Sequence, residues 1–279
     1  MNIDELKGWI DRSGTRNDAA IAASLNTLAA SLDHEATVHQ EGDELPPLWH
    51  WTCFRPSPRQ PQLGHDGHPL KGGLLPPIPW PQRMWAGSPI EFRRPLRVGD
   101  ALSRTSTITD VSLKVGRTRS LTFIKLRHEV SNAAGVVIVE QQDIVYRNPA
   151  TAAAAKPTAA PLAPTWSRLI TPSPPPLFRH SALTFNSHRI HCDRPDAEGV
   201  AGHSGLLAHG PLIATRLPDL LRQAMPAARV TEFSFRAVRP LIDTSSFSVC
   251  GDSQDDGSIR LRAQAARGQL AMTARAQVA

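Results

Sequence analysis

The sequence predicts an α+β fold built of two similar halves, each a long antiparallel sheet wrapped around one helix. The prediction rests on an Ala/Pro-rich stretch near the middle of the 279 residues, on short motifs that recur on either side of it, and on the strand-like runs that follow each recurrence. The stretch covers residues 148–176 and has almost no branched apolar residues, so we expect an irregular or polyproline-like linker. It would separate an N-terminal half, residues 1–147, from a C-terminal half, residues 177–279.

Two short motifs recur in the same order in the two halves. Gly73-Leu74-Leu75 returns as Gly205-Leu206-Leu207, and Arg94-Pro95-Leu96 returns as Arg239-Pro240-Leu241, at offsets of 132 and 145 residues. Recurrence in the same order indicates an ancient duplication. We therefore expect the two halves to superpose.

The helices are expected to be unequal. Residues 211–225 have the apolar spacing of a helix, with Pro211 near its start, where a missing N–H costs nothing. The corresponding part of the first half, residues 75–86, is broken by prolines, so its central helix should be shortened. Residues 18–32 place leucines on one stripe, which predicts an amphipathic N-terminal helix packed on the sheet.

Strand signals follow each recurrent motif. Runs rich in Val, Ile, Thr and Leu, separated by turn residues, predict strands and hairpins. The predicted strands are residues 101–115, 119–130, 135–146, 229–239, 244–251, 258–266 and 269–278.

The composition excludes several function classes. With 41% hydrophobic and 20% charged residues the chain has the balance of a globular protein, and its three cysteines are too scattered for a disulfide framework. The net charge of +6 comes from 26 Arg against 5 Lys, dispersed without stacking aromatics, which argues against nucleic-acid binding. Because the chain has neither a signal-like start nor an 18-residue apolar run, we expect a cytoplasmic protein without a membrane partner.

One segment concentrates chemistry. Asn186, His188, His191 and Asp193 lie within eight residues, next to an apolar run. Imidazole titrates near neutral pH, so such a group beside a hydrophobic wall indicates proton transfer on a small organic substrate.

The segment from Thr184 to Asp193 resembles the signature of the hotdog-fold enoyl-CoA hydratases and MaoC-like dehydratases. It is closest to the branch with the mitochondrial-type 3-hydroxyacyl-thioester dehydratases and the mesaconyl-C4-CoA and itaconyl-CoA hydratases, with Cys192 in place of the usual Tyr. Residues 46–51, 64–69, 72–77, 83–87 and 142–147 also resemble the N-terminal half of that branch.

This resemblance implies a double hotdog whose two sheets join edge to edge. It implies a hydro-lyase that reversibly hydrates an α,β-unsaturated acyl-CoA thioester, with a C5 dicarboxyl substrate such as mesaconyl-C4-CoA or itaconyl-CoA. It further implies one active site per chain in the second half, an acyl-CoA tunnel contributed by the first half, and no cofactor apart from the coenzyme A of the substrate. A homodimer would be compatible with it.

The resemblance also implies catalytic roles. His191 stands at the position of the catalytic acid/base. Asn186 cannot accept a proton, so it would orient the water through its amide oxygen. A second proton-transfer role would fall to His188 or Asp193, unless the first is a scaffold residue and the second a cap at the end of the loop. Gly210, at the start of the predicted helix, would let the thioester oxygen approach unpaired backbone N–H groups.

Four residues are candidates for substrate binding. They are Arg83 and Arg189, whose guanidinium groups suit a carboxylate or a CoA phosphate, Trp85, which would line an acyl tunnel, and His209, which precedes the predicted helix. For each of them packing or a structural ion pair is the plain alternative.

Three rival interpretations remain open. His188, His191, Cys192, His203 and His209 are of types that bind zinc, but they lack the close pairs of a closed site, so we expect no metal. The same fold and oxyanion donors would also serve an acyl-CoA thioesterase. A non-catalytic acyl-CoA-binding protein would need neither acid nor base.

Overall fold

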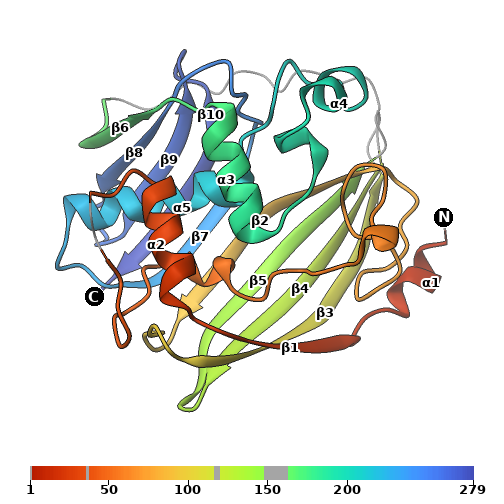
Figure 1. Ribbon diagram of the computed structural model, residues 1–279, viewed down its shortest axis with the longest axis horizontal. Coiled ribbons are helices and arrows are strands. Elements are labelled where there is room, and N and C mark those ends of the chain that lie inside the picture. Colours follow the sequence, from red (N-terminus) through yellow and green to blue (C-terminus); the bar gives the residue numbers. More distant parts are fainter. Residues whose placement is uncertain (1, 36–37, 116–119, 148–162) are drawn as a thin grey trace.

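A computed structural model describes residues 2–35, 38–115, 120–147 and 163–279 of the chain. In this part of the chain ten strands form one antiparallel sheet, shown in Figure 1. The strands are β1 Ser13–Ala19, β2 Gln82–Phe92, β3 Ala101–Val115, β4 Ser120–Asn132, β5 Gly135–Arg147, β6 Trp166–Ile170, β7 Val230–Ala237, β8 Phe247–Ser253, β9 Ile259–Ala265 and β10 Leu270–Val278. All seven predicted strands are present, with ends displaced by three residues or fewer.

The sheet consists of two five-stranded halves joined edge to edge. The strand order is β1-β3-β4-β5-β2-β7-β10-β9-β8-β6, so each half has the same order read outward from the β2–β7 joint. At the joint, Pro89 pairs with Ser234, which is also its counterpart at the predicted offset of 145 residues. This is the double hotdog arrangement that the sequence led us to expect.

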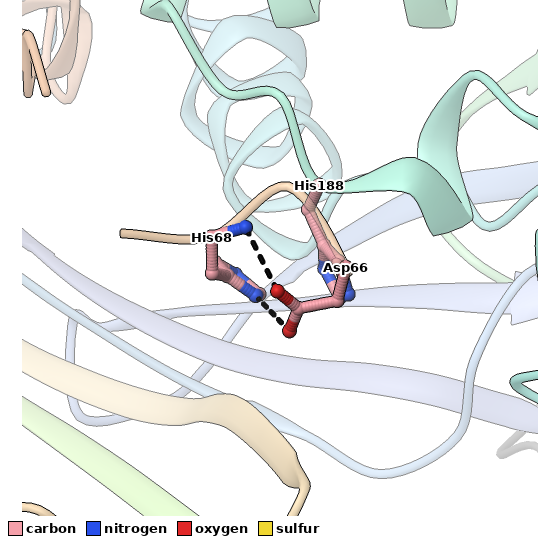
Figure 2. Close-up of side chains that lie close together, drawn as sticks. All are labelled: Asp66, His68 and His188. Carbon is pink, nitrogen blue, oxygen red and sulfur yellow. Dashed lines mark hydrogen bonds and ion pairs between the residues drawn. The ribbon is translucent and has the colours of Figure 1, made fainter. Parts of the chain in front are cut away.

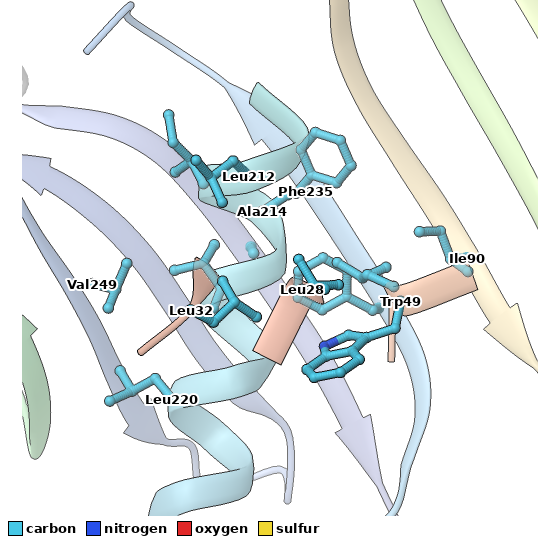
Figure 3. Packing of buried hydrophobic residues seen from close by; sticks show 14 of the residues in the cluster. Leu28, Leu32, Trp49, Ile90, Leu212, Ala214, Leu220, Phe235 and Val249 are labelled. Atoms are coloured by element: carbon cyan, nitrogen blue, oxygen red, sulfur yellow. The ribbon is translucent and has the colours of Figure 1, made fainter. Parts of the chain in front are cut away.

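The second half wraps around the predicted helix, which is α5, Gly210–Ala224. All five strands of this half contact α5, and Ala214, Leu217 and Leu221 are completely buried. Leu212, Ala214 and Leu220 point into the core shown in Figure 3. The continuous burial of these apolar side chains stabilises a helix that carries Pro218 in its interior.

The N-terminal segment differs from the prediction. Residues 13–19 form β1, which pairs with the outer edge of β3, and the helix α2 is shorter, Ala22–Ser31. Its predicted leucine stripe is buried, but α2 packs against α3, Pro174–Thr184, and the short 3-10 helix η1, Trp49–Thr52, instead of lying on the sheet. Figure 1 shows α2 and α3 side by side over α5. The apolar stripe indicated burial but could not identify the partner.

The place of the shortened helix was also wrong. Residues 75–81 contain no helix, and β2 begins at Gln82. The hydrogen bond from Leu45 N to Leu96 O in the first half corresponds to the one from Ala208 N to Leu241 O in the second. The bridge Glu44↔Arg97 likewise corresponds to Leu207↔Ile242. Residues 206–208 therefore match residues 43–45, not residues 74–76, and the match of the two Gly-Leu-Leu motifs is coincidental.

This register places η1 at the position of the first turn of α5. The central helix of the first half is thus reduced to a single turn. The face of the first sheet is covered instead by residues 74–80 and by α1, Ile3–Lys7, whose Leu6 is buried with Ile78.

The expected linker is shorter than predicted. Strand β6 lies inside residues 148–176 and pairs with β8, because the alternation in Trp166–Ile170 suits an edge strand. Helix α3 begins at Pro174, also within that range. Residues 148–162 lie outside the described part of the chain. No helix in the described part is both long and apolar enough to cross a membrane.

Candidate active site

The segment that resembles the hydratase signature connects α3 with α4, Arg194–Gly199. Helix α3 ends at Thr184. The C-cap residue Phe185 has a positive φ of 53°, and the amide of Asn186 donates to Ser181 O at 2.8 Å. The side-chain oxygen of Asn186 then accepts the amide N–H of His188 at 3.1 Å. The amide oxygen that was expected to orient water therefore also holds the loop, and it positions His188.

A loop of the first half is docked on this segment. The amide of Arg189 donates to Asp66 O at 2.9 Å, and the Ser187 hydroxyl donates to Gly67 O at 2.6 Å. Gly67 has a φ of 82°, and a Cβ there would lie 2.8 Å from the carbonyl carbon of Ser187 and closer still to its oxygen. The approach of the two backbones therefore requires glycine at this position.

The docked loop brings two residues to the site for which sequence reasoning gave no role. Figure 2 shows Asp66 and His68 next to His188. Asp66 accepts the side-chain Nδ1–H of His68 at 3.1 Å and its amide N–H at 3.0 Å, and the rings of His68 and His188 are 3.8 Å apart. The only signal was the likeness of residues 64–69 to the family, which does not say where this loop folds.

The charges of this group follow from its burial. Burial raises the pKa of Asp66, but the side-chain and backbone hydrogen bonds from His68 outweigh it, so the pKa lies below its usual value and the group is a carboxylate. Burial is the largest cause that lowers the pKa of His188, to about 2, with the charge of His68 next. Burial also lowers the pKa of His68, and the hydrogen bond to Asp66 opposes this shift. The ionised carboxylate of Asp66 therefore lies beside the neutral rings of His68 and His188.

His191 lies at the centre of the cluster. It belongs to the 3-10 helix η3, Arg189–His191, and its Nδ1 donates to Leu207 O at 2.8 Å, which leaves the lone pair on Nε2. Its ring is perpendicular to that of His188 at 5.5 Å and stacks on that of His209 at 3.7 Å. Burial lowers the pKa of His191 to about 4, so the group is a neutral base at pH 7.

His209 and Gly210 form the start of α5 beside this base. His209 is the N-cap residue, and no side chain caps the helix, so the first N–H groups are available to a ligand. The Nε2 of His209 pairs with Ser181 Oγ at 2.9 Å, while its buried Nδ1 has no partner among the described residues. A Cβ on Gly210 would meet open space. The helix start is therefore open and carries partial positive charge.

Arg83 lies near the histidines from the start of β2. Its positive charge lowers the pKa of both His68 and His188, behind burial as the main cause. It is paired in register with Tyr146 of β5; burial raises the pKa of that residue and the charge of Arg83 opposes the shift. The structure thus brings Arg83 to the cluster with His188, His191, His209 and Gly210.

Two other candidates have structural contacts instead. Arg189 places Nε and Nη2 on Asp193 at 3.0 and 2.8 Å and Nη1 on His65 O and Asp196, so its guanidinium is fully engaged within the protein. Asp193 also caps helix α4, Arg194–Gly199, as the cap interpretation predicted. The indole N–H of Trp85 contacts Gly87 O and Ser88 Oγ, and its ring packs on Trp51 and Phe235.

Among the described residues, Asp66, His68 and His188 have donor atoms within 4.8 Å of one another, the types of atom that bind cations. Imidazoles that share one ion point radially away from it, so their ring centres lie farther apart than their nitrogens. The 3.8 Å between the centres of His68 and His188 is the spacing of packed neutral rings. The zinc ligands weighed from the sequence do not form this group, apart from His188.

Comparison with known proteins agrees with this geometry. The chain is 40% identical over 277 residues to mesaconyl-C4-CoA hydratase of Chloroflexus aurantiacus, covering 98% of each protein. It is 23% identical over 231 residues to the mitochondrial hydroxyacyl-thioester dehydratase type 2 of Schizosaccharomyces pombe, covering 74% of this chain and 77% of that protein.

The fold is shared with solved structures. A MaoC-like dehydratase from Phytophthora capsici superposes with a TM-score of 0.77 at 14% identity, over 100% of this chain and 98% of the other. The model of the family described as hydroxyacyl-thioester dehydratase type 2 matches residues 48–243. The chain therefore belongs to the hydroxyacyl-thioester dehydratase type 2 family and is a hydro-lyase of the hotdog fold.

Proposed function

We propose that the protein reversibly hydrates an α,β-unsaturated acyl-CoA that carries a second carboxylate, with mesaconyl-C4-CoA as the first substrate to test. One observation carries the proposal. The neutral His191, with its lone pair on Nε2, stacks on the ring of His209, and His209 is the residue directly before the open N-terminus of α5. These are the base and the oxyanion donors that addition of water to an enoyl thioester needs.

His191 handles the proton in this proposal. Its Nε2 takes a proton from water as the oxygen bonds to the β-carbon, and the π electrons move onto the thioester oxygen. The resulting enolate oxygen lies against the N–H groups of Gly210 and Leu212 at the helix start, where the helix dipole stabilises negative charge. The imidazolium then returns the proton to the α-carbon, which restores the thioester and the neutral base. Dehydration follows the same steps in reverse.

The first half places a carboxylate beside His188, whose ring lies next to that of the base His191. Asp66 accepts the Nδ1–H of His68, so that Nε2 of His68 carries a lone pair. The negative charge of Asp66 also raises the pKa of His188, against the larger lowering by burial. A carboxylate beside an imidazole stabilises the imidazolium form. We assign this role to Asp66 because Asn186, the polar residue that precedes His188 in the loop, cannot carry a charge.

Arg83 gives the site its preference for a dicarboxyl substrate in this proposal. Its guanidinium is close enough to His68 and His188 to lower the pKa of both, and it makes a two-pronged contact with a carboxylate feasible. The mesaconyl-C4-CoA hydratase of Chloroflexus aurantiacus, at 40% identity, is named for such a substrate.

Product analysis tests the proposal. Purified protein is mixed with mesaconyl-C4-CoA or crotonyl-CoA, while enoyl absorbance and free thiol are followed together. Hydration removes the enoyl absorbance and leaves the thioester intact. Release of CoA thiol would identify a thioesterase, and a change in neither signal would leave only binding. Faster turnover of crotonyl-CoA than of the dicarboxyl substrate would refute the substrate assignment alone.

A further inference from the structure

The two halves are related by an internal two-fold axis that predicts a second site. The axis passes between Pro89 and Ser234, and it exchanges residues of β2 with residues of β7 that lie 145 positions later. The proposed hydratase site lies between Arg83, at the start of β2, and the N-terminus of α5. The symmetry-related site must lie at the other end of the joint, where β2 ends and β7 begins. The rise of a strand puts this place about 30 Å away.

The structure has a cavity at that place. Its volume is about 350 Å³, within the range of small-ligand pockets. It is lined by the end of β2, the start of β7 and residues 44–47. By the hydrogen bonds that relate the halves, residues 44–47 correspond to Leu207–Gly210, which anchor His191 and begin α5. The cavity is therefore the first-half counterpart of the hydratase site.

The counterpart lacks the groups for hydration. Pro46 and Pro47 stand where the second half has His209 and Gly210, and proline has no N–H to offer a thioester oxygen. The one histidine in its lining, His50, has its Nε2 at 3.3 Å from the buried carboxylate of Glu140. The lining of this cavity therefore has no counterpart of the base His191.

The lining is nevertheless suited to an anion. Arg94, Arg222 and Arg229 line the cavity, and its one carboxylate, Glu44, is paired at 2.7 Å with Arg97, which lies outside the lining. Arg94 donates one N–H to Ala134 O, and Arg222 approaches Asp219 only to 3.9 Å. The other walls are apolar and include Phe92, Leu96, Ile138 and Val230.

We propose that this cavity is a second, non-catalytic binding site for an organic anion, a carboxylate or phosphate carried on a small apolar body. The internal symmetry places it at the counterpart of the hydratase site, the prolines lack the N–H donors that hydration needs, and the arginines supply positive charge. It is separate from the catalytic centre, so it does not depend on the substrate proposed above.

Binding measurements on the full chain test this site. Two probes are titrated separately by calorimetry: coenzyme A, which carries phosphates but no enoyl group, and methylfumarate, which carries carboxylates alone. The test variant is Arg94→Gln with Arg229→Gln, and the matched control is Arg93→Gln. Arg93 is the exposed neighbour of Arg94, pairs with Glu91 at 3.0 Å and does not line the cavity.

We expect at least one probe to bind the double variant tenfold or more weakly, since charge-assisted hydrogen bonds are lost, while kcat/KM for enoyl-CoA stays within about twofold of wild type. The control should match wild type in both. Loss of coenzyme A binding would identify a phosphate site, and loss of methylfumarate binding a carboxylate site. Equal affinities of the double variant and the control for both probes would overturn the proposal. So would an equal fall in binding and kcat/KM, which would make the cavity part of the path of the catalytic ligand.

Discussion

The contact of Asp66 and Gly67 with the loop around Ser187 can be tested by adding one methyl group. Gly67→Ala introduces a Cβ that meets the backbone of Ser187, whereas Gly72→Ala, in the same part of the chain, meets nothing within 4 Å. Both glycines have positive φ, 82° and 96°. Each change therefore carries a similar backbone cost of about 1–2 kcal/mol, and only Gly67→Ala also displaces the loop.

The two variants should separate stability from activity. We expect each to lower Tm by roughly 2–8 °C, and Gly67→Ala by more, because a loss of about 1 kcal/mol corresponds to roughly 2–4 °C in a chain of about this size. Only Gly67→Ala should lower kcat, by about 100-fold, since a displacement of about 1 Å is enough for that loss. Enoyl-CoA hydration and thermal unfolding measure the two effects. If folded Gly67→Ala protein keeps the kcat of Gly72→Ala, the first-half loop takes no part in catalysis.

Four further changes test the site. His191→Ala should lower kcat by roughly two to four orders of magnitude in a folded protein, and near-normal turnover would remove His191 from the mechanism. Asp66→Asn should lower kcat about 10- to 100-fold, because it removes the negative charge beside His68 and His188 and weakens the hydrogen bonds that order the docked loop; an unchanged kcat in folded protein would exclude Asp66 from the mechanism. Arg83→Met should cost about 1.5–3 kcal/mol in kcat/KM for mesaconyl-C4-CoA and much less for crotonyl-CoA, and equal losses would assign Arg83 to coenzyme A or to the fold. Burial lowers the pKa of His180 to about 3, against about 6.5 unfolded, so the unfolded chain binds an extra proton below pH 6.5. The urea midpoint of unfolding should therefore fall between pH 7 and pH 5, and it should fall less in His180→Gln. An equal fall of the midpoint in both proteins would contradict the buried neutral state.

The features that sequence predicted well are local ones. The strands were found because alternation and turn residues are set within a few positions of the chain, and α5 because its apolar spacing runs over four turns. The candidate catalytic segment could be singled out in the same way, because Asn186, His188 and His191 are neighbours in sequence; the catalytic roles of these residues stay predictions. Strand β1 was missed because its residues are polar and mostly exposed, and its pairing with the edge of β3 depends on backbone contacts almost a hundred residues away, such as Thr15 with Thr105.

The features that were missed depend on contacts between the halves. Ser187 and Gly67, whose backbones touch, are 120 residues apart, so no local pattern places His68 beside His188. Arg189 was taken for a substrate ligand because its carboxylate partners could not be assigned from their position in the sequence. The two Gly-Leu-Leu motifs misplaced the missing helix because short apolar motifs recur by chance, while the Arg-Pro-Leu motif follows the strand that forms the joint.

The asymmetry of the two halves explains how one site gains what the other lacks. In the second half, the residues after Leu207 lead into α5, which packs against all five strands of its half and whose first N–H groups have no side-chain cap. In the first half the same position begins with Pro46 and Pro47 and yields only η1, so about 30 residues before β2 are free of a central helix. Those residues include the loop that carries Asp66 and His68 across the joint to His188. The half without a central helix therefore supplies a carboxylate to the histidine cluster of the other half, and the proposed catalytic centre draws on both halves of the chain.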